Sequence, residues 1–241
     1  MRPSRLPAGG TADPIRLLII NPNSNEAITA QIRNLAQRTL GPGTEGVVVD
    51  LPAAPLAIQS PADRAIAEPL AIARIEQAVS QGFHGAVLAC FDDIAIIARG
   101  RLPIPIIDAV DASLTIARTC ARRYAIVTTF EAAVPRIRAL VARHGLDGVC
   151  TVHAAGIGVT TTAHLSLGTQ EKLREIIGTA IGGDGAEAII LGSGALAGRA
   201  PVLAEGIDIP VIDSIEAAIR LAAVSAAMSC RDLVHRTPVA G

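Results

Sequence analysis

The chain has 241 residues, a formal net charge of −1 at pH 7 and a hydrophobic share of 50%. With three Phe, one Tyr and no Trp, it lacks the aromatic rings on which single-stranded nucleic acids stack. The nearly neutral charge and the absence of a basic run argue against binding to a phosphate backbone. No apolar stretch reaches the roughly 18 residues of a membrane span. We therefore expect no nucleic-acid partner and no membrane partner.

The N-terminal residues 1–14 contain two Arg and three Pro but no apolar segment, which indicates a disordered leader and not a secretory signal. Because no signal is evident, we expect a cytoplasmic protein in a reducing compartment. The four cysteines show no paired CxxC spacing, so the sequence predicts neither a zinc site nor a redox motif. Cys120 and Cys230 lie in Ala-rich helical stretches, where we expect buried and unreactive thiols.

Short apolar runs bounded by Gly or Pro alternate with amphipathic stretches. In chain order the predicted elements are strand 15–20, helix 26–38, strand 47–51, helix 61–81, strands 85–90 and 104–108, helix 109–122, strand 124–128, helix 131–144, strand 149–155, helix 166–182, strands 186–192 and 209–213, and helix 214–229. Strands that are apolar throughout are buried on both faces, and their alternation with helices favours parallel sheets. We predict an α/β fold with two pseudo-symmetric, doubly wound lobes, parallel four-stranded sheets and an active-site cleft between the lobes.

An internal repeat supports the two lobes. The run AVLAC, which ends at Cys90, recurs as AIILGS, which ends at Ser193, and each copy precedes a Pro-led strand, IPIIDA or IPVIDS. A shift of 103 residues brings Cys90 onto Ser193. We expect lobe 1 to comprise residues 15–122 and lobe 2 residues 123–241, with a terminal helix that can cross over to lobe 1. The repeat would place a thiol and a hydroxyl at equivalent strand ends.

Four polar loops follow predicted strands directly. They are NPNSN at 21–25, CFDD at 90–93, TTF at 128–130 and SGA at 193–195. Ligands bind at the carboxyl ends of parallel strands because loops there present backbone N–H groups and helix N-termini. Asn, Ser and Thr in such loops can simply cap helices, but three Asn and a Pro within five residues exceed the need of one cap. We therefore expect Asn21 or Asn23 to bind a ligand through its amide.

Cys90 and Ser193 are the residues best placed for chemistry. A free Cys at a strand end is commonly a small core residue, yet backbone dipoles there can lower its pKa and make it a nucleophile or a base, so both roles stay open. Ser193 lies in LGSGALAG, which is neither a GxSxG elbow nor a Walker loop. Its flanking glycines allow backbone N–H groups to approach a substrate oxygen. A hydroxyl needs an activating neighbour before it can act as a base.

Few side chains qualify as activators. His153 and His164 flank a glycine-containing loop, and they can either reach the cleft or stay structural. The two aspartates at 92–93 are interpreted as a solvated pair or a helix cap. Asp108 and Asp213 occupy equivalent positions after the Pro-led strands, and we expect them to be helix N-caps.

Four motifs, in this order, resemble the aspartate/glutamate/hydantoin racemase superfamily and in particular its hydantoin and allantoin racemases. They are INPNS at 20–24, ACFxD at 89–93, IVTT at 126–129 and ILGxG at 190–194. The likeness extends over residues 15–226. It implies a homo-oligomeric racemase without cofactor or metal, in which two cysteines face each other across the α-carbon of a small-molecule substrate. One removes the proton, and the other returns a proton to the opposite face.

By this resemblance Cys90 matches the first family cysteine, and Ser193 stands where the second is expected. Asp92 stands where close relatives have Gly. The candidate catalytic residues are Cys90 and Ser193, and the candidate substrate-binding residues are Asn21, Asn23, Ile58, Phe91, Asp93, Thr128, Thr129, Gly194 and Ala195. Ser193 is either an engineered replacement or a natural feature of a member with altered chemistry.

The resulting hypothesis is an isomerase that racemises a 5-substituted hydantoin or allantoin by Cys-based proton transfer, with the Ser193 form weakened or inactive. One alternative is a single-cysteine decarboxylase or lyase of the same superfamily, similar to arylmalonate decarboxylase, in which only a proton donor is needed after CO2 loss. Another is a non-catalytic two-lobe protein that binds a small molecule.

Overall fold

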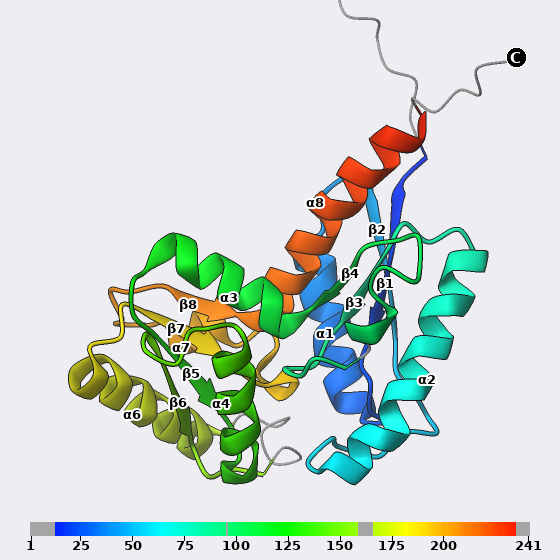
Figure 1. Cartoon of the computed structure of the whole chain (residues 1–241). Coiled ribbons are helices and arrows are strands. Elements are labelled where there is room, and N and C mark those ends of the chain that lie inside the picture. Colours follow the sequence, from blue (N-terminus) through cyan, green and yellow to red (C-terminus); the bar gives the residue numbers. More distant parts are fainter. Residues whose placement is uncertain (1–12, 95, 159–165, 235–241) are drawn as a thin grey trace, which may run out of the picture.

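The computed structural model describes residues 13–94, 96–158 and 166–234. Its strands form two four-stranded sheets, with strand orders β2-β1-β3-β4 and β6-β5-β7-β8 (Figure 1). All neighbouring strands run parallel. The predicted α/β fold with two parallel four-stranded sheets is therefore confirmed. The leader expected at residues 1–14 lies almost wholly outside the described residues.

The two sheets are built by consecutive stretches of the chain. The first stretch contains β1 (Ile15–Ile20), α1 (Glu26–Thr39), β2 (Thr44–Val49), α2 (Pro61–Ser80), β3 (Gly85–Leu88), η1 (Ile96–Ala98), β4 (Ile106–Asp108) and α3 (Ala109–Cys120). The second contains β5 (Tyr124–Thr128), η2 (Glu131–Ala133), α4 (Val134–Arg143), β6 (Cys150–Ala154), α6 (Leu167–Asp184), β7 (Ala188–Leu191), η3 (Gly194–Leu196), α7 (Ala200–Leu203), β8 (Val211–Asp213) and α8 (Ser214–Val234). The short helices η1, η3 and α7 have no counterpart in the prediction, because three or four residues carry no readable periodicity.

The strand register shows the same repeat as the sequence. The last residues of β3 and β4 lie opposite each other, and so do the last residues of β7 and β8. Cys90 lies two residues beyond β3, and Ser193 lies two residues beyond β7. Since the paired sheets share one topology, the two side chains occupy equivalent positions at the carboxyl ends of central strands.

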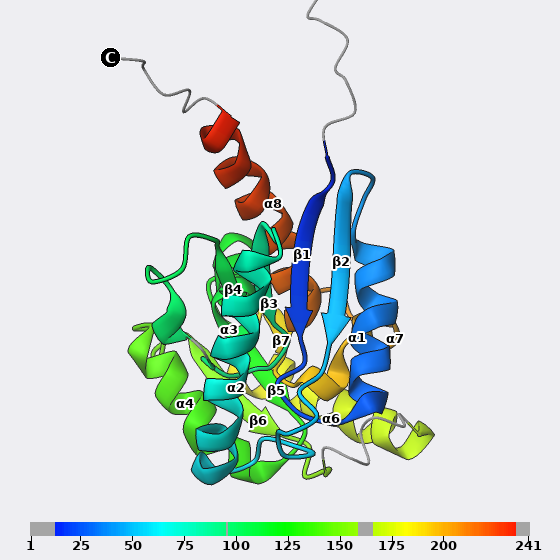
Figure 2. The ribbon, with the colours of Figure 1, turned by 90° about the vertical axis from the view of Figure 1, so that its right-hand side faces the viewer.

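The first sheet is covered by helices on both faces. Leu18 and Ile20 of β1 pack towards α2, whereas Leu17 and Ile19 pack in the cluster that contains α1 and α8. This alternation follows from the two-residue period of a strand. Figure 2 shows α1 and α2 on opposite sides of β1 and β2. The continuous apolar runs of the sequence are thus explained by burial on both faces.

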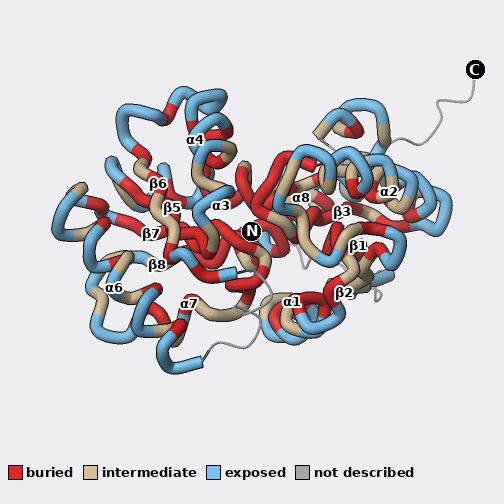
Figure 3. Tube along the Cα trace, turned by 90° about the horizontal axis from the view of Figure 1, so that it is seen from below, coloured by how far each residue is buried: buried red, intermediate tan, exposed pale blue. Residues whose placement is uncertain are grey.

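Two helices cross between the sheets. α3 follows β4 of the first sheet but packs against β7 and β8, and α8 follows β8 but packs against β1, β3 and β4. α3 and α8 also pack against each other (Figure 1). One apolar cluster consequently contains residues of both sheets, and Figure 3 shows buried residues running through the middle of the molecule. This shared core fixes the two strand ends relative to each other.

The two equivalent aspartates are N-caps, as predicted. The Asp108 side chain accepts a hydrogen bond from the backbone N–H of Asp111 at 2.8 Å. Asp213 accepts from the N–H groups of Ile215 at 2.9 Å and Glu216 at 3.1 Å. Burial raises the pKa of each of the two capping carboxyls to about 6, although the backbone donors favour the charged form. Both therefore titrate near neutral pH.

The Asp213→Asn variant is expected to lose part of the pH dependence of stability. The folded pKa of Asp213, about 6, lies above the unfolded value of about 3.9, so its contribution to stability is complete below pH 4 and is lost as the pH rises through 6. Between pH 5 and 7 this amounts to about 1 kcal/mol. Urea unfolding at both pH values should show a smaller loss in the variant than in the wild type, and an equal loss would contradict the assignment.

The described cysteines differ from expectation at one position. Cys120 is exposed, because it is the last residue of α3 and lies beyond the packed face of that helix, so the prediction of a buried thiol is wrong there. The Cys230 side chain lies outside the described residues.

None of the helices in the described part of the chain combines the length and hydropathy of a membrane span.

Candidate active site

A cavity lies between the carboxyl ends of the two sheets and is lined by residues of both halves. Eight predicted site residues line it: Asn23, Ile58, Cys90, Phe91, Thr128, Ser193, Gly194 and Ala195. The cavity volume is about 80 Å³. This is well above the about 10–15 Å³ that a cavity needs to hold one water, so there is space for several waters or a small ligand.

The two strand-end loops touch beside this cavity. A Cβ atom on Gly194 would lie 3.1 Å from the carbonyl oxygen of Ala89. A Cβ atom on Gly192 would lie 2.4 Å from Cγ2 of Ile126 and 3.4 Å from the Phe91 ring. These contacts explain why glycine flanks Ser193, since a larger residue would separate the loops. Cys90 and Ser193 therefore belong to adjoining loops of one site.

Cys90 is half-buried and protonated at neutral pH. Burial raises the pKa of its thiol to about 11, and the nearby charges of Arg136 and Arg64 oppose this rise, whereas Asp108 adds to it. The expected lowering of the pKa by backbone dipoles does not dominate, because desolvation of a thiolate is the larger effect. The resting thiol is thus a proton donor, and the two guanidinium groups favour its ionised form.

Ser193 is buried and caps the short helix η3. Its Oγ accepts a hydrogen bond from the backbone N–H of Ala195 at 3.3 Å. Within the described part of the chain, no acidic or basic side chain forms a hydrogen bond with this hydroxyl. A serine hydroxyl without such a partner is a poor base at neutral pH. The second strand end therefore carries a polar group that lacks the acid–base capacity of a thiol.

Three predicted binding residues do not line the cavity. Asn21 is buried, and its Nδ2 donates to Oδ1 of Asn23 at 2.9 Å and to Oγ1 of Thr29 at 3.0 Å, so it positions Asn23. Thr129 is fully buried behind Thr128. Asp93, the third, belongs to an ion-pair cluster. Of the asparagine loop, only Asn23 is in direct reach of a ligand in this cavity.

Of the two predicted histidine activators, the structure describes only His153, which does not line the cavity. His153 lies on the edge strand β6, and its Nε2 is 2.5 Å from Oδ2 of Asp184, beside a different cavity. In the second sheet, β5 lies between β6 and β7, whose end carries Ser193. His164 lies outside the described residues.

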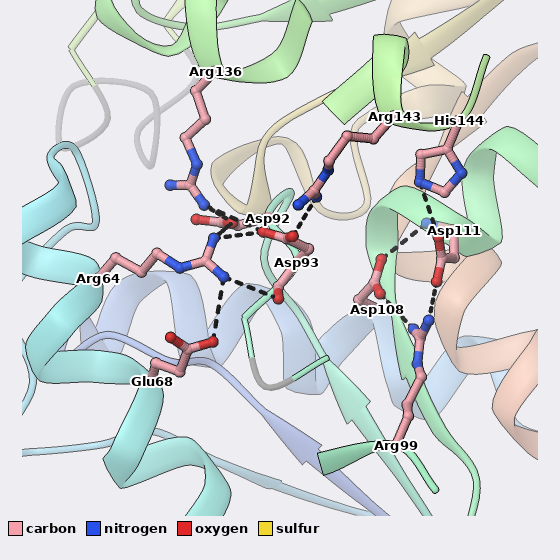
Figure 4. Close-up of polar contacts among 10 residues, drawn as sticks. All are labelled: Arg64, Glu68, Asp92, Asp93, Arg99, Asp108, Asp111, Arg136, Arg143 and His144. Atoms are coloured by element: carbon pink, nitrogen blue, oxygen red, sulfur yellow. Dashed lines mark hydrogen bonds and ion pairs between the residues drawn. The ribbon is translucent and has the colours of Figure 1, made fainter. Parts of the chain in front are cut away.

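The two aspartates after Cys90 are buried, so the interpretation as a solvated pair is wrong. Arg64 on α2 donates from Nη1 to Asp92 at 2.7 Å and to Asp93 at 2.5 Å. Arg136 on α4 pairs with Asp92, and Arg143 pairs with Asp93 (Figure 4). Burial would raise the pKa of Asp93, but Arg64 and Arg143 hold it below its ordinary value. The loop is fixed by cations from both halves.

Sequence reasoning did not find the arginines of this cluster. Arg136 also lines the cavity, together with Asp92. A basic residue on an amphipathic helix is normally interpreted as part of a solvated face, and nothing in the sequence relates it to an aspartate 44 positions earlier.

Within the described residues, no group of three or more His, Cys, Asp or Glu side chains is arranged to hold a metal ion.

Together, the fold and the site define a duplicated two-sheet α/β protein with a small cavity at the junction of its halves. The family model described as Asp/Glu/Hydantoin racemase matches residues 17–222. The chain therefore belongs to the Asp/Glu/hydantoin racemase family, whose members that match it below are isomerases.

The relatives agree with this assignment. The chain is 32% identical over 206 residues to a hydantoin racemase of Rhizobium meliloti, which covers 85% of this chain and 86% of the relative. The structure of allantoin racemase from Klebsiella pneumoniae superposes with a TM-score of 0.83 at 32% identity, covering 89% of this chain and 88% of that one. Allantoin racemase from Pseudomonas fluorescens gives a TM-score of 0.81 at 26% identity, covering 94% and 98%.

Proposed function

We propose that the protein catalyses proton transfer at the α-carbon of a hydantoin-like ring, either a 5-substituted hydantoin or allantoin. The observation that carries the proposal is that Cys90 and Ser193, at equivalent strand ends, line one small cavity. The substrates named for the relatives support the same ring class.

In the proposed reaction, Cys90 works on one face of the substrate. Because the resting thiol is protonated, it first releases its proton to water, and the thiolate so formed accepts the α-proton. The C–H electron pair moves into the neighbouring ring carbonyl to give an enolate. The thiol then returns a proton to the same carbon. Gly194 lines the cavity, and we propose that its backbone N–H donates to the enolate oxygen, the kind of contact that stabilises developing charge. Every step uses a protein group, water or the substrate, so we expect no need for a cofactor or metal.

Ser193 limits the outcome on the opposite face. Racemisation requires a donor and an acceptor of matched pKa on the two faces of the carbon. The unassisted hydroxyl of Ser193 is far too weak an acid and base for this exchange. We therefore propose that the chain as given exchanges the α-proton of one enantiomer efficiently but inverts that carbon slowly.

The direct test is α-proton exchange in D2O with each enantiomer of allantoin and of 5-isopropylhydantoin. We expect deuterium to enter the one enantiomer whose α-proton faces Cys90, faster than optical rotation is lost, as followed by proton NMR and polarimetry. Enzyme-free samples correct for spontaneous exchange. Equal exchange of both enantiomers would show that a group on the opposite face of the carbon also transfers protons. No exchange of either enantiomer would contradict the proposed substrate class for the chain with Ser193.

A second candidate is decarboxylation of a disubstituted malonate, favoured by the protonated state of Cys90. Loss of CO2 would leave an enolate, to which the thiol donates its proton, and water then reprotonates the thiolate. Only one thiol is required. Release of CO2 from phenylmethylmalonate, lost in a Cys90→Ala variant, would favour this activity over racemisation.

We also expect the protein to act on its small-molecule substrate in the cytoplasm as a homo-oligomer. Light scattering on the purified chain tests the oligomeric state. The proposed reaction uses only residues of one chain, so it does not depend on the result.

A further inference from the structure

Two opposite charges line the cavity beside Cys90. Asp92 lies two residues after the thiol, and Arg136 reaches the cavity from α4 of the other half (Figure 4). Oδ1 of Asp92 is bound by Arg64 at 2.7 Å and by Arg136. The Asp92 side chain is only 4% exposed, and its Oδ2 receives no hydrogen bond from any residue that the structure describes. A buried carboxylate with one oxygen lacking a hydrogen bond lowers the stability of the fold, so its presence calls for an explanation.

The charge environment of the thiol is assembled from several elements. Arg64 on α2 and Arg136 on α4 supply positive charge, whereas Asp108 at the start of α3 supplies negative charge. Asp92 and Asp93 add two carboxylates in the loop that carries the thiol. Of these groups, only Asp92 and Arg136 line the cavity. They also pair with each other, so the charge that each presents to the cavity depends on the other.

We propose that Asp92 and Arg136 are positioning residues that together set the ionisation of the Cys90 thiol. Arg136 stabilises the thiolate by its positive charge. Asp92 offsets this effect by pairing with Arg136, which reduces the positive charge that Arg136 presents to the cavity. These two opposing charges keep the thiol protonated at rest but allow it to ionise, so that the thiolate can accept a proton from the substrate.

The pair also couples this balance to the junction of the halves. Asp92 belongs to the loop after β3, whereas Arg136 comes from α4, which covers the second sheet. The charged pair in the cavity is therefore complete only when the loop after β3 and helix α4 are both in place. This arrangement gives Asp92 a defined role in the acid–base chemistry.

Alkylation of Cys90 by iodoacetamide measures its thiolate directly. The reagent reacts with the thiolate, so at pH 9, below the thiol pKa, the rate follows the ionised fraction. An opposite or like charge close to the group shifts a pKa by about one unit, and the accompanying change in nucleophilicity halves the effect on log rate. We expect Arg136→Gln to lower the second-order rate about threefold and Asp92→Asn to raise it about threefold. Peptide mass spectrometry separates Cys90 from the other thiols.

Three controls separate charge from structure. Arg136→Lys keeps the charge and should react at close to the wild-type rate. Arg138→Gln removes a charge from an exposed position on the same helix that does not line this cavity, and it should leave the rate unchanged. Asp93→Asn breaks ion pairs between the halves without removing a cavity charge, and it should raise the rate less than Asp92→Asn does.

Several outcomes would overturn the proposal. These are shifts of the same sign for Arg136→Gln and Asp92→Asn, an Arg136→Lys variant that behaves like Arg136→Gln, or an equal rise in Asp93→Asn, which would indicate simple loosening of the junction. The proposal builds on the acid–base role proposed for Cys90. Alkylation needs no substrate, however, so the electrostatic assignment can hold even if the substrate class is wrong, and it can fail even if that class is right.

Discussion

Replacement of Ser193 by cysteine is expected to raise the rate of racemisation of a single enantiomer of allantoin or 5-isopropylhydantoin by about 10²–10⁴-fold. The new thiol would occupy the strand end equivalent to Cys90 and line the same cavity. It would supply a proton donor and acceptor whose pKa is close to that of Cys90, which the hydroxyl lacks. The measurement is loss of optical rotation with time, with deuterium exchange of both enantiomers followed in parallel.

Ser193→Ala is the matched control for this gain. It removes the hydroxyl and its contact with the N–H of Ala195 but adds no acid–base group. We expect exchange of the enantiomer facing Cys90 to persist, with no rise in racemisation. A folded Ser193→Cys protein that exchanges neither enantiomer would remove hydantoin-like rings from consideration as substrates.

The second large effect is expected for Cys90→Ala. It should lower α-proton exchange by about 10²–10⁴-fold, because the only thiol that lines the cavity, among the residues that the structure describes, would be gone. Proton NMR in D2O measures the residual rate. Cys120→Ala is the control, since it removes an exposed thiol at the end of α3 and should leave exchange unchanged.

This substitution also separates catalysis from binding. If neither the wild type nor Cys90→Ala turns over any candidate substrate, while both bind it with equal affinity in calorimetry, the protein is a binding protein and the catalytic proposal is wrong. A loss of exchange with affinity retained would instead place Cys90 in the chemical step.

The secondary structure was predictable because its signals are local. Most strands are apolar runs that end at Gly, Pro or a polar loop, and β1 and β5 have the predicted bounds. β2 begins three residues before its apolar run, at Thr44. The N-caps Asp108 and Asp213 were predicted from their place before apolar helices, which short-range hydrogen bonds determine. The internal repeat predicted two similar sheets, because two stretches with the same order of strands and helices favour the same sheet topology.

The surroundings of the thiol were not predictable in the same way. The sequence suggested a lowered pKa for Cys90 from strand-end dipoles, but the pKa is raised to about 11 because burial outweighs them. It also left Asp92 and Asp93 as a solvated pair or a helix cap, although three arginines from two helices form ion pairs with them. Desolvation and ion pairing depend on which distant segments meet, and residue spacing does not encode that directly.

The sequence by itself determined the elements, the duplicated α/β architecture, the family resemblance and the pairing of Cys90 with Ser193, because each depends on local pattern or on the repeat. Only the tertiary structure decided that α3 and α8 cross between the sheets, that Asn21 supports Asn23 behind the cavity, and that Arg136 reaches Asp92. These features arise from contacts between residues far apart in the chain, whose energies depend on burial and on distance in the folded molecule.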